Sequence, residues 1–267
     1  MNIVVCVKHV PDSTADWQFE SDNTVDRVSV DGLLSELDEY AVEQALQVKE
    51  KQGDAAEVTV TALSVGPEKA ADAVRKALQM GADKGVHVVD DAIAGSDAIA
   101  TSLVLAKAIE KLGAESKVDL VVCGMASTDG GMSVVPAMLA ERLALPQVTL
   151  ASVIETQGAQ VRIKRDGDVA TEVIGATLPI VLSVTDQSGE ARYPSFKGIM
   201  AAKKKPFDTL SLGDIGVDAG QVGLSVAYSA VEATEARPPR TAGEIVTDED
   251  GSGAKALVDF LAGKKFI

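Results

Sequence analysis

The chain has 267 residues, of which 46% are hydrophobic and only 3% aromatic, and it carries a formal net charge of −15. This length predicts one large domain, or one domain with an appendage, built around a substantial core. No apolar run approaches the ~20 residues of a membrane span, so we expect no membrane insertion, and we expect no nucleic-acid partner for so acidic a chain.

The N-terminus and the two cysteines predict the compartment. The first ten residues, MNIVVCVKHV, lack the basic start, long apolar region and cleavage site of a secretory signal. They also lack the Arg- and Ser-rich character of an organellar transit peptide. Cys6 and Cys123 lie inside apolar runs, which favours two buried, reduced thiols over a disulfide. We therefore expect a cytoplasmic protein.

The first part of the chain alternates between strand and helix patterns. Apolar or β-rich runs predict strands, and apolar residues at helical spacing predict helices: strands over 2–7, 58–65, 86–89 and 118–123, helices over 38–51, 68–80, 96–112 and 134–143. Asp38 is expected to cap the first helix, Gly81 to end the second in a left-handed conformation, and Gly113 to end the third. Parallel strands joined by such helices form right-handed crossovers and a sheet covered on both faces.

The pattern changes after Pro146. Further strands are expected over 147–154, 161–165, 169–176 and 178–184, with Asp166-Gly167 as a hairpin signal. The sequence therefore predicts an α/β fold in which residues 1–185 form a doubly wound, mostly parallel core with a β extension. Residues 186–206 are expected to form a partner-recognition loop and a helix start. Residues 207–267 are expected to form an extended C-terminal arm, with a linker at 237–240 and one short amphipathic helix at 254–263.

A nucleotide site is predicted in the loop that follows the strand at 118–123. No G-x-G-x-x-G opens a helix after the first strand, and the chain contains no Walker A sequence. The segment Val122–Val135, VCGMASTDGGMSVV, instead places small residues between a buried strand and a helix, where backbone N–H groups and the helix N-terminus approach a phosphate. The same pattern also fits a flexible loop without a ligand. Asp129 is expected either to accept backbone N–H bonds or to contact a ribose hydroxyl.

A docking element is predicted at residues 190–206, EARYPSFKGIMAAKKKP. The segment contains an aromatic–proline–aromatic cluster and a lysine run, namely Tyr193, Pro194, Phe196, Lys203, Lys204 and Lys205. Exposed apolar side chains beside a basic run, in an acidic protein, favour a surface that meets a partner. An ordinary loop with solvated lysines is the alternative.

The sequence contains no catalytic constellation. Neither of the two histidines, His9 and His87, has a nearby cysteine or acidic pair with metal-ligand spacing, and there is no nucleophile elbow or redox C-x-x-C. We therefore expect no catalytic residues and no metal site.

Several separated segments together resemble one protein family. They are similar, in order, to blocks of the electron transfer flavoprotein beta subunit: AVEQALQVKEK (41–51), VGPEKAADAVRKALQMGADKGVHV (65–88), STDGG (127–131), ALPQVTLAS (144–152), ATLPIVLSV (176–184) and RYPSFKGIMAAKKK (192–205). The resemblance implies an adenine-nucleotide alpha-hydrolase-like fold in a heterodimer whose alpha subunit holds most of the FAD. It also implies electron transfer from flavin dehydrogenases, such as the acyl-CoA dehydrogenases of fatty acid beta-oxidation, towards a quinone reductase.

By position, the resemblance implies a buried AMP at the carboxyl ends of the strands. The implied AMP contacts are Cys6, Ser35, Glu36, Leu37, Asp38, Val65, Gly124, Met125, Ala126, Ser127, Thr128, Asp129, Gly130, Gly131, Met132, Ser133, Val134 and Val135. Many family members have Thr-Gly-Gln where this chain has Val135-Pro136-Ala137, so Ser133 and the amides of Gly130 and Gly131 are expected to serve the phosphate. Ser13 and Leu37 fall where the family approaches the FAD ring.

The resemblance also implies the docking residues and the role of the arm. The implied docking residues are Arg192, Tyr193, Pro194, Phe196, Ile199, Met200, Lys203, Lys204 and Lys205, with Phe196 as the anchor. The C-terminal arm is expected to pack on the alpha subunit. Two alternatives stay open: an electron-bifurcating beta subunit with a second FAD in place of AMP, or a sensor of ATP or AMP similar to stress proteins.

Overall fold

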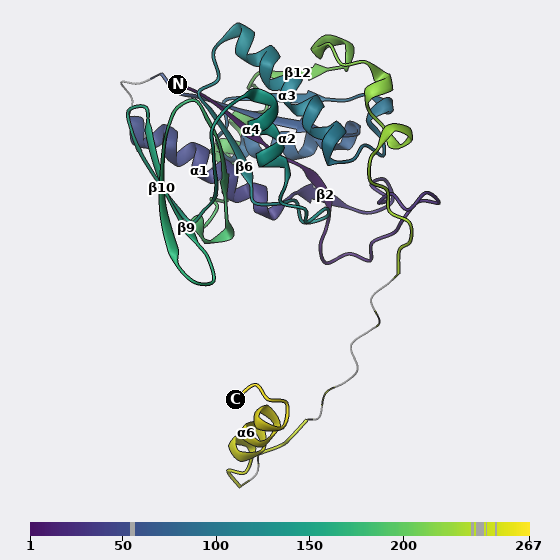
Figure 1. The fold of residues 1–267 in the computed structure, drawn as a ribbon, viewed down its shortest axis with the longest axis vertical. Coiled ribbons are helices and arrows are strands. Elements are labelled where there is room, and N and C mark those ends of the chain that lie inside the picture. The colour runs from purple at the N-terminus through teal and green to yellow at the C-terminus, as the bar shows by residue number, and fades with distance from the viewer. Residues whose placement is uncertain (54–56, 236–237, 239–242, 244, 249) are drawn as a thin grey trace. The chain divides into compact units, whose positions relative to one another are not determined.

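The computed structural model describes residues 1–53, 57–235, 238, 243, 245–248 and 250–267. The chain forms two compact units, Met1–Glu232 and Ala233–Ile267, which are described separately. Figure 1 shows the course of the chain through them. Among the residues that the structure describes, no helix combines the length and the apolar run that a membrane crossing requires.

A seven-stranded parallel sheet forms the centre of the first unit, with the strand order β12-β5-β4-β1-β6-β11-β7. Its strands are β1 (Asn2–Cys6), β4 (Thr59–Val65), β5 (Lys84–Val88), β6 (Leu120–Gly124), β7 (Gln147–Ala151), β11 (Ile180–Val184) and β12 (Phe207–Leu210). The helices are α1 (Glu36–Gln52), α2 (Ala71–Met80), α3 (Ala98–Glu115), α4 (Val135–Leu143), α5 (Phe196–Ala202) and, in the second unit, α6 (Gly253–Gly263). The order reverses at β1, which confirms the predicted doubly wound, mostly parallel α/β fold.

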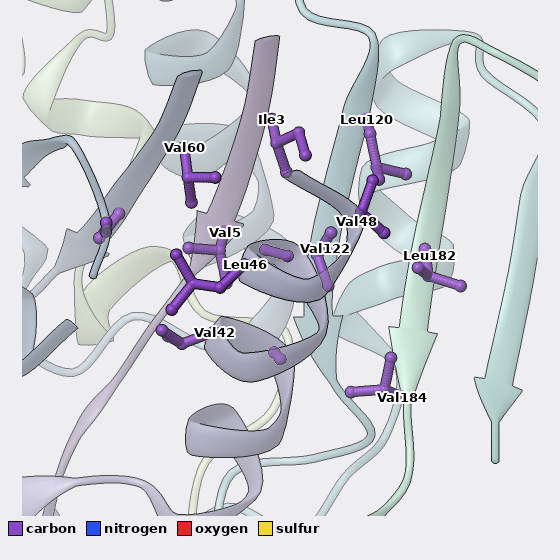
Figure 2. Packing of buried hydrophobic residues seen from close by; sticks show 14 of the residues in the cluster. Ile3, Val5, Val42, Leu46, Val48, Val60, Leu120, Val122, Leu182 and Val184 are labelled. Carbon is purple, nitrogen blue, oxygen red and sulfur yellow. The ribbon is translucent and has the colours of Figure 1, made fainter. Parts of the chain in front are cut away.

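Two hydrophobic clusters cover the two faces of this sheet. On one face, α1 and α2 pack against side chains such as Ile3 and Val122, and Figure 2 shows residues of α1 directed at β1, β4 and β6. On the other face, α3 and α4 pack against side chains such as Val4 and Val121. Because both faces are buried, the strands are nearly continuous apolar runs rather than alternating ones.

The ends of two helices differ from the sequence-based expectation. Helix α1 begins at Glu36 with Ser35 at the N-cap position, so Asp38 is not its cap. Helix α3 continues through Gly113 to Glu115, since one glycine costs a helix only about 1 kcal/mol relative to alanine. The expectation for Gly81 is confirmed, because it follows α2 with a φ of 144°, which glycine adopts readily.

A second sheet forms the predicted β extension (Figure 1). It contains the antiparallel strands β8 (Val153–Gln157), β9 (Gln160–Asp166) and β10 (Thr171–Thr177). The hairpin expected at Asp166-Gly167 is confirmed, and the N–H of Gly167 donates to Ala170 at 3.1 Å. The single strand expected over 147–154 is instead two strands in different sheets, β7 and β8, which are separated at Ser152.

A short hairpin, β2 (His9–Pro11) and β3 (Gly32–Leu34), was not expected from the sequence. Its strands are only three residues long, and twenty residues separate them, so no local pattern indicates the pairing. We call residues 12–31 between the two strands the excursion.

The boundary of the C-terminal arm, expected at residue 207, differs from the structure. Residues 207–232 belong to the first unit. Strand β12 pairs with β5, and four side chains that follow it are buried in the core: Leu212, Ile215, Val217 and Val222. Short turns separate these four residues, so they follow neither a helix nor a strand period, and the sequence pattern did not predict their burial. In the second unit, α6 confirms the predicted helix, while Arg237, Pro239 and Arg240 of the expected linker lie outside the described residues.

Truncation tests this boundary. A chain ending at Glu232 is expected to unfold cooperatively in urea. A chain ending at Pro206 is expected to have a much lower free energy of unfolding, because it loses β12 and four buried apolar side chains, each worth about 1.5–3 kcal/mol. Circular dichroism during urea unfolding would measure both. Equal stability of the two truncated chains would contradict the placement of residues 207–232 in the core.

Candidate functional site

The carboxyl ends of three neighbouring strands form the edge at which the site was expected. Strand β1 lies between β4 and β6 and is parallel to both, so Cys6, Val65 and Gly124 end on the same edge of the sheet. Ligands of open α/β sheets bind at this edge, beside the point where the strand order reverses. The fold thus brings together residues from three distant parts of the predicted site.

Asp38 connects α1 to this edge. Its Oδ2 accepts the backbone N–H of Lys8 at 2.9 Å, and a Cβ placed on Gly124 would lie only 2.5 Å from its Oδ1. Glycine at position 124 is therefore required for this close approach. Burial raises the pKa of Asp38 to about 7, while the N–H and the charge of Lys8 act in the opposite direction.

A buried ion cluster holds the loop after β6, which we call the nucleotide loop (residues 124–135). The Asp129 side chain is only 1% exposed, and it pairs with Lys8 Nζ at 2.8 Å and with the guanidinium of Arg27. Burial opposes its ionisation, but the charges of Lys8 and Arg27 outweigh that effect and hold the pKa of Asp129 well below its usual range. Asp129 was expected to accept backbone N–H bonds, and its Oδ1 accepts the N–H of Gly130 at 2.7 Å.

The amides expected to serve a phosphate are already used within the loop. The N–H of Gly130 donates to Ser127 Oγ and to Asp129, and that of Gly131 donates to the carbonyl of Ser127 at 2.9 Å. Gly131, with a φ of 60°, and Ser133, with a φ of 57°, then reverse the chain towards α4.

The next three N–H groups lie where a phosphate could use them. Within the described residues, no hydrogen bond takes up the N–H groups of residues 132–134, which directly precede the uncapped N-terminus of α4. Pro136 lies in the first turn of α4, where its lack of an N–H costs nothing. Free N–H groups at a helix N-terminus fit a phosphate group.

The remaining predicted contacts surround this loop. Ser35 is buried, and its Oγ accepts the N–H of Thr128 at 3.4 Å, which ties the start of α1 to the nucleotide loop. Cys6 is buried, Leu37 is half-buried, and Ser13 is exposed within the excursion. Lys8 and Arg27 were missed by the sequence analysis. Lys8 directly follows the first strand, which is a usable signal, but nothing near Arg27 indicates its distant partner.

The predicted docking segment is anchored at both ends and exposed in the middle. Arg192 pairs with Glu43 and Glu50 of α1, each with a closest distance of 2.6 Å, and Lys205 Nζ donates to the carbonyls at the end of α2. Lys205 therefore caps α2 rather than facing solvent. Between these anchors, Tyr193 is 93% exposed and Phe196 is 80% exposed.

Helix α5 of the docking segment rests on α2. Ser195 caps α5 by accepting the N–H of Gly198 at 3.1 Å, and a Cβ on Gly198 would lie 2.5 Å from the carbonyl oxygen of Gln79. Glycine thus permits α5 to lie close to α2. The other predicted docking residues are Pro194, which is half-buried, and Ile199, Met200, Lys203 and Lys204, which are exposed.

The two histidines serve the fold. The His9 ring lies against Gly32, where a Cβ would clash with it, and His87 Nε2 lies 3.1 Å from the carbonyl oxygen of Gly66. Cys6 and Cys123 are buried free thiols. In the part of the chain that the structure describes, no three His, Cys, Asp or Glu side chains are grouped for a metal ion.

The raised pKa of Asp38 predicts how stability depends on pH. The carboxyl of Asp38 ionises near pH 3.8 in the unfolded chain and near pH 7 in the folded chain. Protonation of Asp38 therefore stabilises the folded state relative to the unfolded state. This contribution to the free energy of unfolding is complete below about pH 4 and is lost as the pH rises to about 7. It amounts to roughly 4 kcal/mol, since one pKa unit corresponds to about 1.36 kcal/mol.

Two measurements check this expectation. The carboxyl carbon of Asp38 is expected to titrate in NMR with a midpoint near pH 7, and Asp38→Asn is expected to remove the corresponding slope from urea-unfolding free energies. The slopes with pH are compared, because the asparagine loses one acceptor at every pH. A midpoint near 3.8 would contradict the dominant effect of burial on this carboxyl.

Comparison with known proteins agrees with this architecture. The electron transfer flavoprotein domain matches residues 22–215. Electron transfer flavoprotein subunit beta of Mycobacterium tuberculosis (strain ATCC 25618 / H37Rv) is 47% identical, and that of Mycobacterium leprae is 46% identical, each over 100% of this chain and 99% of the relative. The subunit beta of Megasphaera elsdenii is 34% identical over 99% of this chain and 97% of its own. This chain therefore belongs to the electron transfer flavoprotein family, within its group of beta subunits.

Proposed function

We propose that this chain is the beta subunit of a heterodimer that accepts electrons from flavin dehydrogenases and passes them towards a quinone reductase. The observation that carries the proposal is the docking segment, in which exposed aromatic side chains are held by internal anchors on a chain of an electron-transfer family. Acyl-CoA dehydrogenases of fatty acid beta-oxidation are the proposed donors, and the cytoplasm is the proposed compartment. The chain acts as a carrier without catalytic residues of its own.

The docking segment supports this role through its rigidity. Because Arg192 and Lys205 hold its ends, Phe196 is presented to a partner with little loss of backbone freedom on binding. Phe196 then fills an apolar pocket on the dehydrogenase, while Lys203 and Lys204 face the partner's surface. A carrier anchored in this way gains effective concentration without a tight second interface.

The nucleotide loop supports an AMP site in this chain. We assign the phosphate to the N–H groups of residues 132–134, the hydroxyl of Ser133 and the N-terminus of α4, in a loop to which Lys8 adds a positive charge at Asp129. The ends of β1, β4 and α1, at Cys6, Val65 and residues 35–38, surround the nucleoside. AMP has no redox chemistry, so its role here is to hold the strand ends and the loop together.

FAD is proposed to be held mainly by the alpha subunit, where it supplies one- and two-electron transfer. On this chain, Ser13 and Leu37 lie on the side that approaches the flavin. In the second unit, α6 exposes Leu257, Val258 and Phe260, which are 59%, 52% and 54% exposed. Apolar side chains grouped on one helix favour cover by a partner, and we propose that the arm packs on the alpha subunit.

The family membership argues against the self-sufficient sensor, which needs no flavoprotein partner. An electron-bifurcating subunit with a second FAD is the remaining alternative, because the same loop and strand ends would receive its adenosine phosphate.

Replacement of the docking anchor tests the proposed function. Phe196→Ala is expected to lower electron transfer from an acyl-CoA dehydrogenase by roughly ten-fold or more, because a buried aromatic anchor dominates an interface of this kind. Coupled stopped-flow reduction of the heterodimer measures the rate. Val169→Ala is the matched control, since Val169 is 99% exposed on the turn between β9 and β10 and lies outside the docking segment. Unchanged transfer by Phe196→Ala would refute this docking role.

Cofactor analysis tests the nucleotide assignment. The chain co-expressed with its alpha subunit is expected to release stoichiometric AMP and one equivalent of FAD on acid treatment, since only one flavin site is proposed. Chromatography of the released nucleotides, together with the visible absorption spectrum, measures both. Two flavins and no AMP would favour the bifurcating alternative, and no adenine nucleotide beyond the FAD would contradict the AMP site.

A further inference from the structure

We propose that Arg27 couples the excursion to the nucleotide loop, so that a bound nucleotide phosphate orders residues 12–31. This inference rests on the proposed nucleotide site and adds a regulatory connection to it. The excursion carries Ser13, which we assigned to the side facing the flavin. The coupling would therefore link nucleotide occupancy to the surface beside the electron carrier.

The excursion has little apolar packing of its own to hold it. None of residues 12–31 is buried, and Phe19 and Val28 are 42% and 75% exposed. Inside the excursion, the backbone bonds join its own residues, such as the one from the N–H of Glu20 to the carbonyl of Thr24 at 2.8 Å. Its position on the rest of the molecule therefore depends on a few polar anchors.

Three side chains provide these anchors in the described residues. Lys69 Nζ donates to the carbonyl of Val28 at 2.8 Å, and Asn23 donates to the carbonyls of residues 231 and 232. Arg27 donates to the carbonyl of His9 at 3.2 Å and to the carboxylate of Asp129. Of these three anchors, Arg27 is the one that reaches the nucleotide loop.

The charges around Asp129 favour an arriving phosphate. Lys8 and Arg27 together carry two positive charges and share the single carboxylate of Asp129, so one positive charge is left unmatched. The Lys8 ammonium lies beside Gly130 of the loop, 3.9 Å from where a Cβ of this residue would be. Among the described residues, neither cation pairs with a second carboxylate, and Asp38 bonds to the backbone N–H of Lys8. A phosphate bound by the same loop is attracted by this excess positive charge, and Arg27 senses it through Asp129, which both segments share.

Hydrogen–deuterium exchange on the heterodimer, with AMP as the probe, tests the coupling. In the wild type, AMP is expected to slow exchange in residues 12–31 by about fivefold or more. Arg27→Gln is expected to lose this response and to weaken AMP binding, because coupling between two sites is reciprocal. Lys69→Gln is the matched control, since it removes another anchor of the excursion but leaves the nucleotide loop untouched. Its excursion is expected to exchange faster and still respond to AMP. An AMP response that survives in Arg27→Gln would overturn the proposal.

A second experiment tests the ion pair without nucleotide. In the nucleotide-free heterodimer, Asp129→Asn is expected to accelerate exchange in the excursion. Adding Arg27→Gln to this variant is expected to cause less change than Arg27→Gln causes in the wild type, because the ion pair is already lost and only the bond to the His9 carbonyl remains. Independent, additive effects would overturn the coupling. Calorimetry of AMP binding to the wild type separates the two proposals. If AMP does not bind, the proposed nucleotide site is refuted, while the nucleotide-free experiment still decides whether Arg27 and Asp129 act together.

Discussion

The buried carboxyl group of Asp38 joins parts of the chain that are distant in sequence. It lies in the first turn of α1, accepts the N–H of Lys8 just after β1, and contacts Gly124 at the end of β6. A parallel sheet brings the ends of β1 and β6 to one edge, so a single side chain ties the first turn of the helix to both strand ends. The nucleotide loop starts at Gly124, and its place on the edge follows from this contact.

Charge organises the next layer of the site. In a chain with a net charge of −15, two cations converge on the buried carboxylate of Asp129. Such a cluster contributes little net stability, because desolvation offsets the attraction, but removal of one partner leaves a poorly solvated charge behind. The cluster therefore specifies one arrangement of the loop and joins it to two other segments of the chain.

The docking segment follows a different physical rule. The charged residues at its two ends, Arg192 and Lys205, bond to other parts of the same chain, and its aromatic side chains are exposed to solvent. Binding residues placed on a loop gain precision when packed elements hold the loop. Helices α1 and α2 provide that support here, so the surface for a partner and the core of the fold share the same two helices.

Much of the fold was predictable because its signals are local. Apolar runs indicated the buried strands, helical periodicity indicated α2 and α4, and the small residues after β6 indicated the loop at the sheet edge. The family resemblance rested on similar blocks of adjacent residues and agrees with the comparisons. Each of these features depends on residues that are neighbours in the chain.

Other features depended on contacts between residues far apart in the chain. The pairing of Arg27 with Asp129 spans 102 residues, and Lys205 caps a helix that ends more than 120 residues earlier. The burial of Leu212 and Ile215 likewise requires the face of the sheet beneath α3 to be already formed. Local patterns in the sequence therefore determined the elements and their order, whereas tertiary packing decided which charges meet, which amides stay free and where the core ends. Such contacts leave no periodic trace in the sequence, because they arise only when the assembled sheet brings its distant edges together.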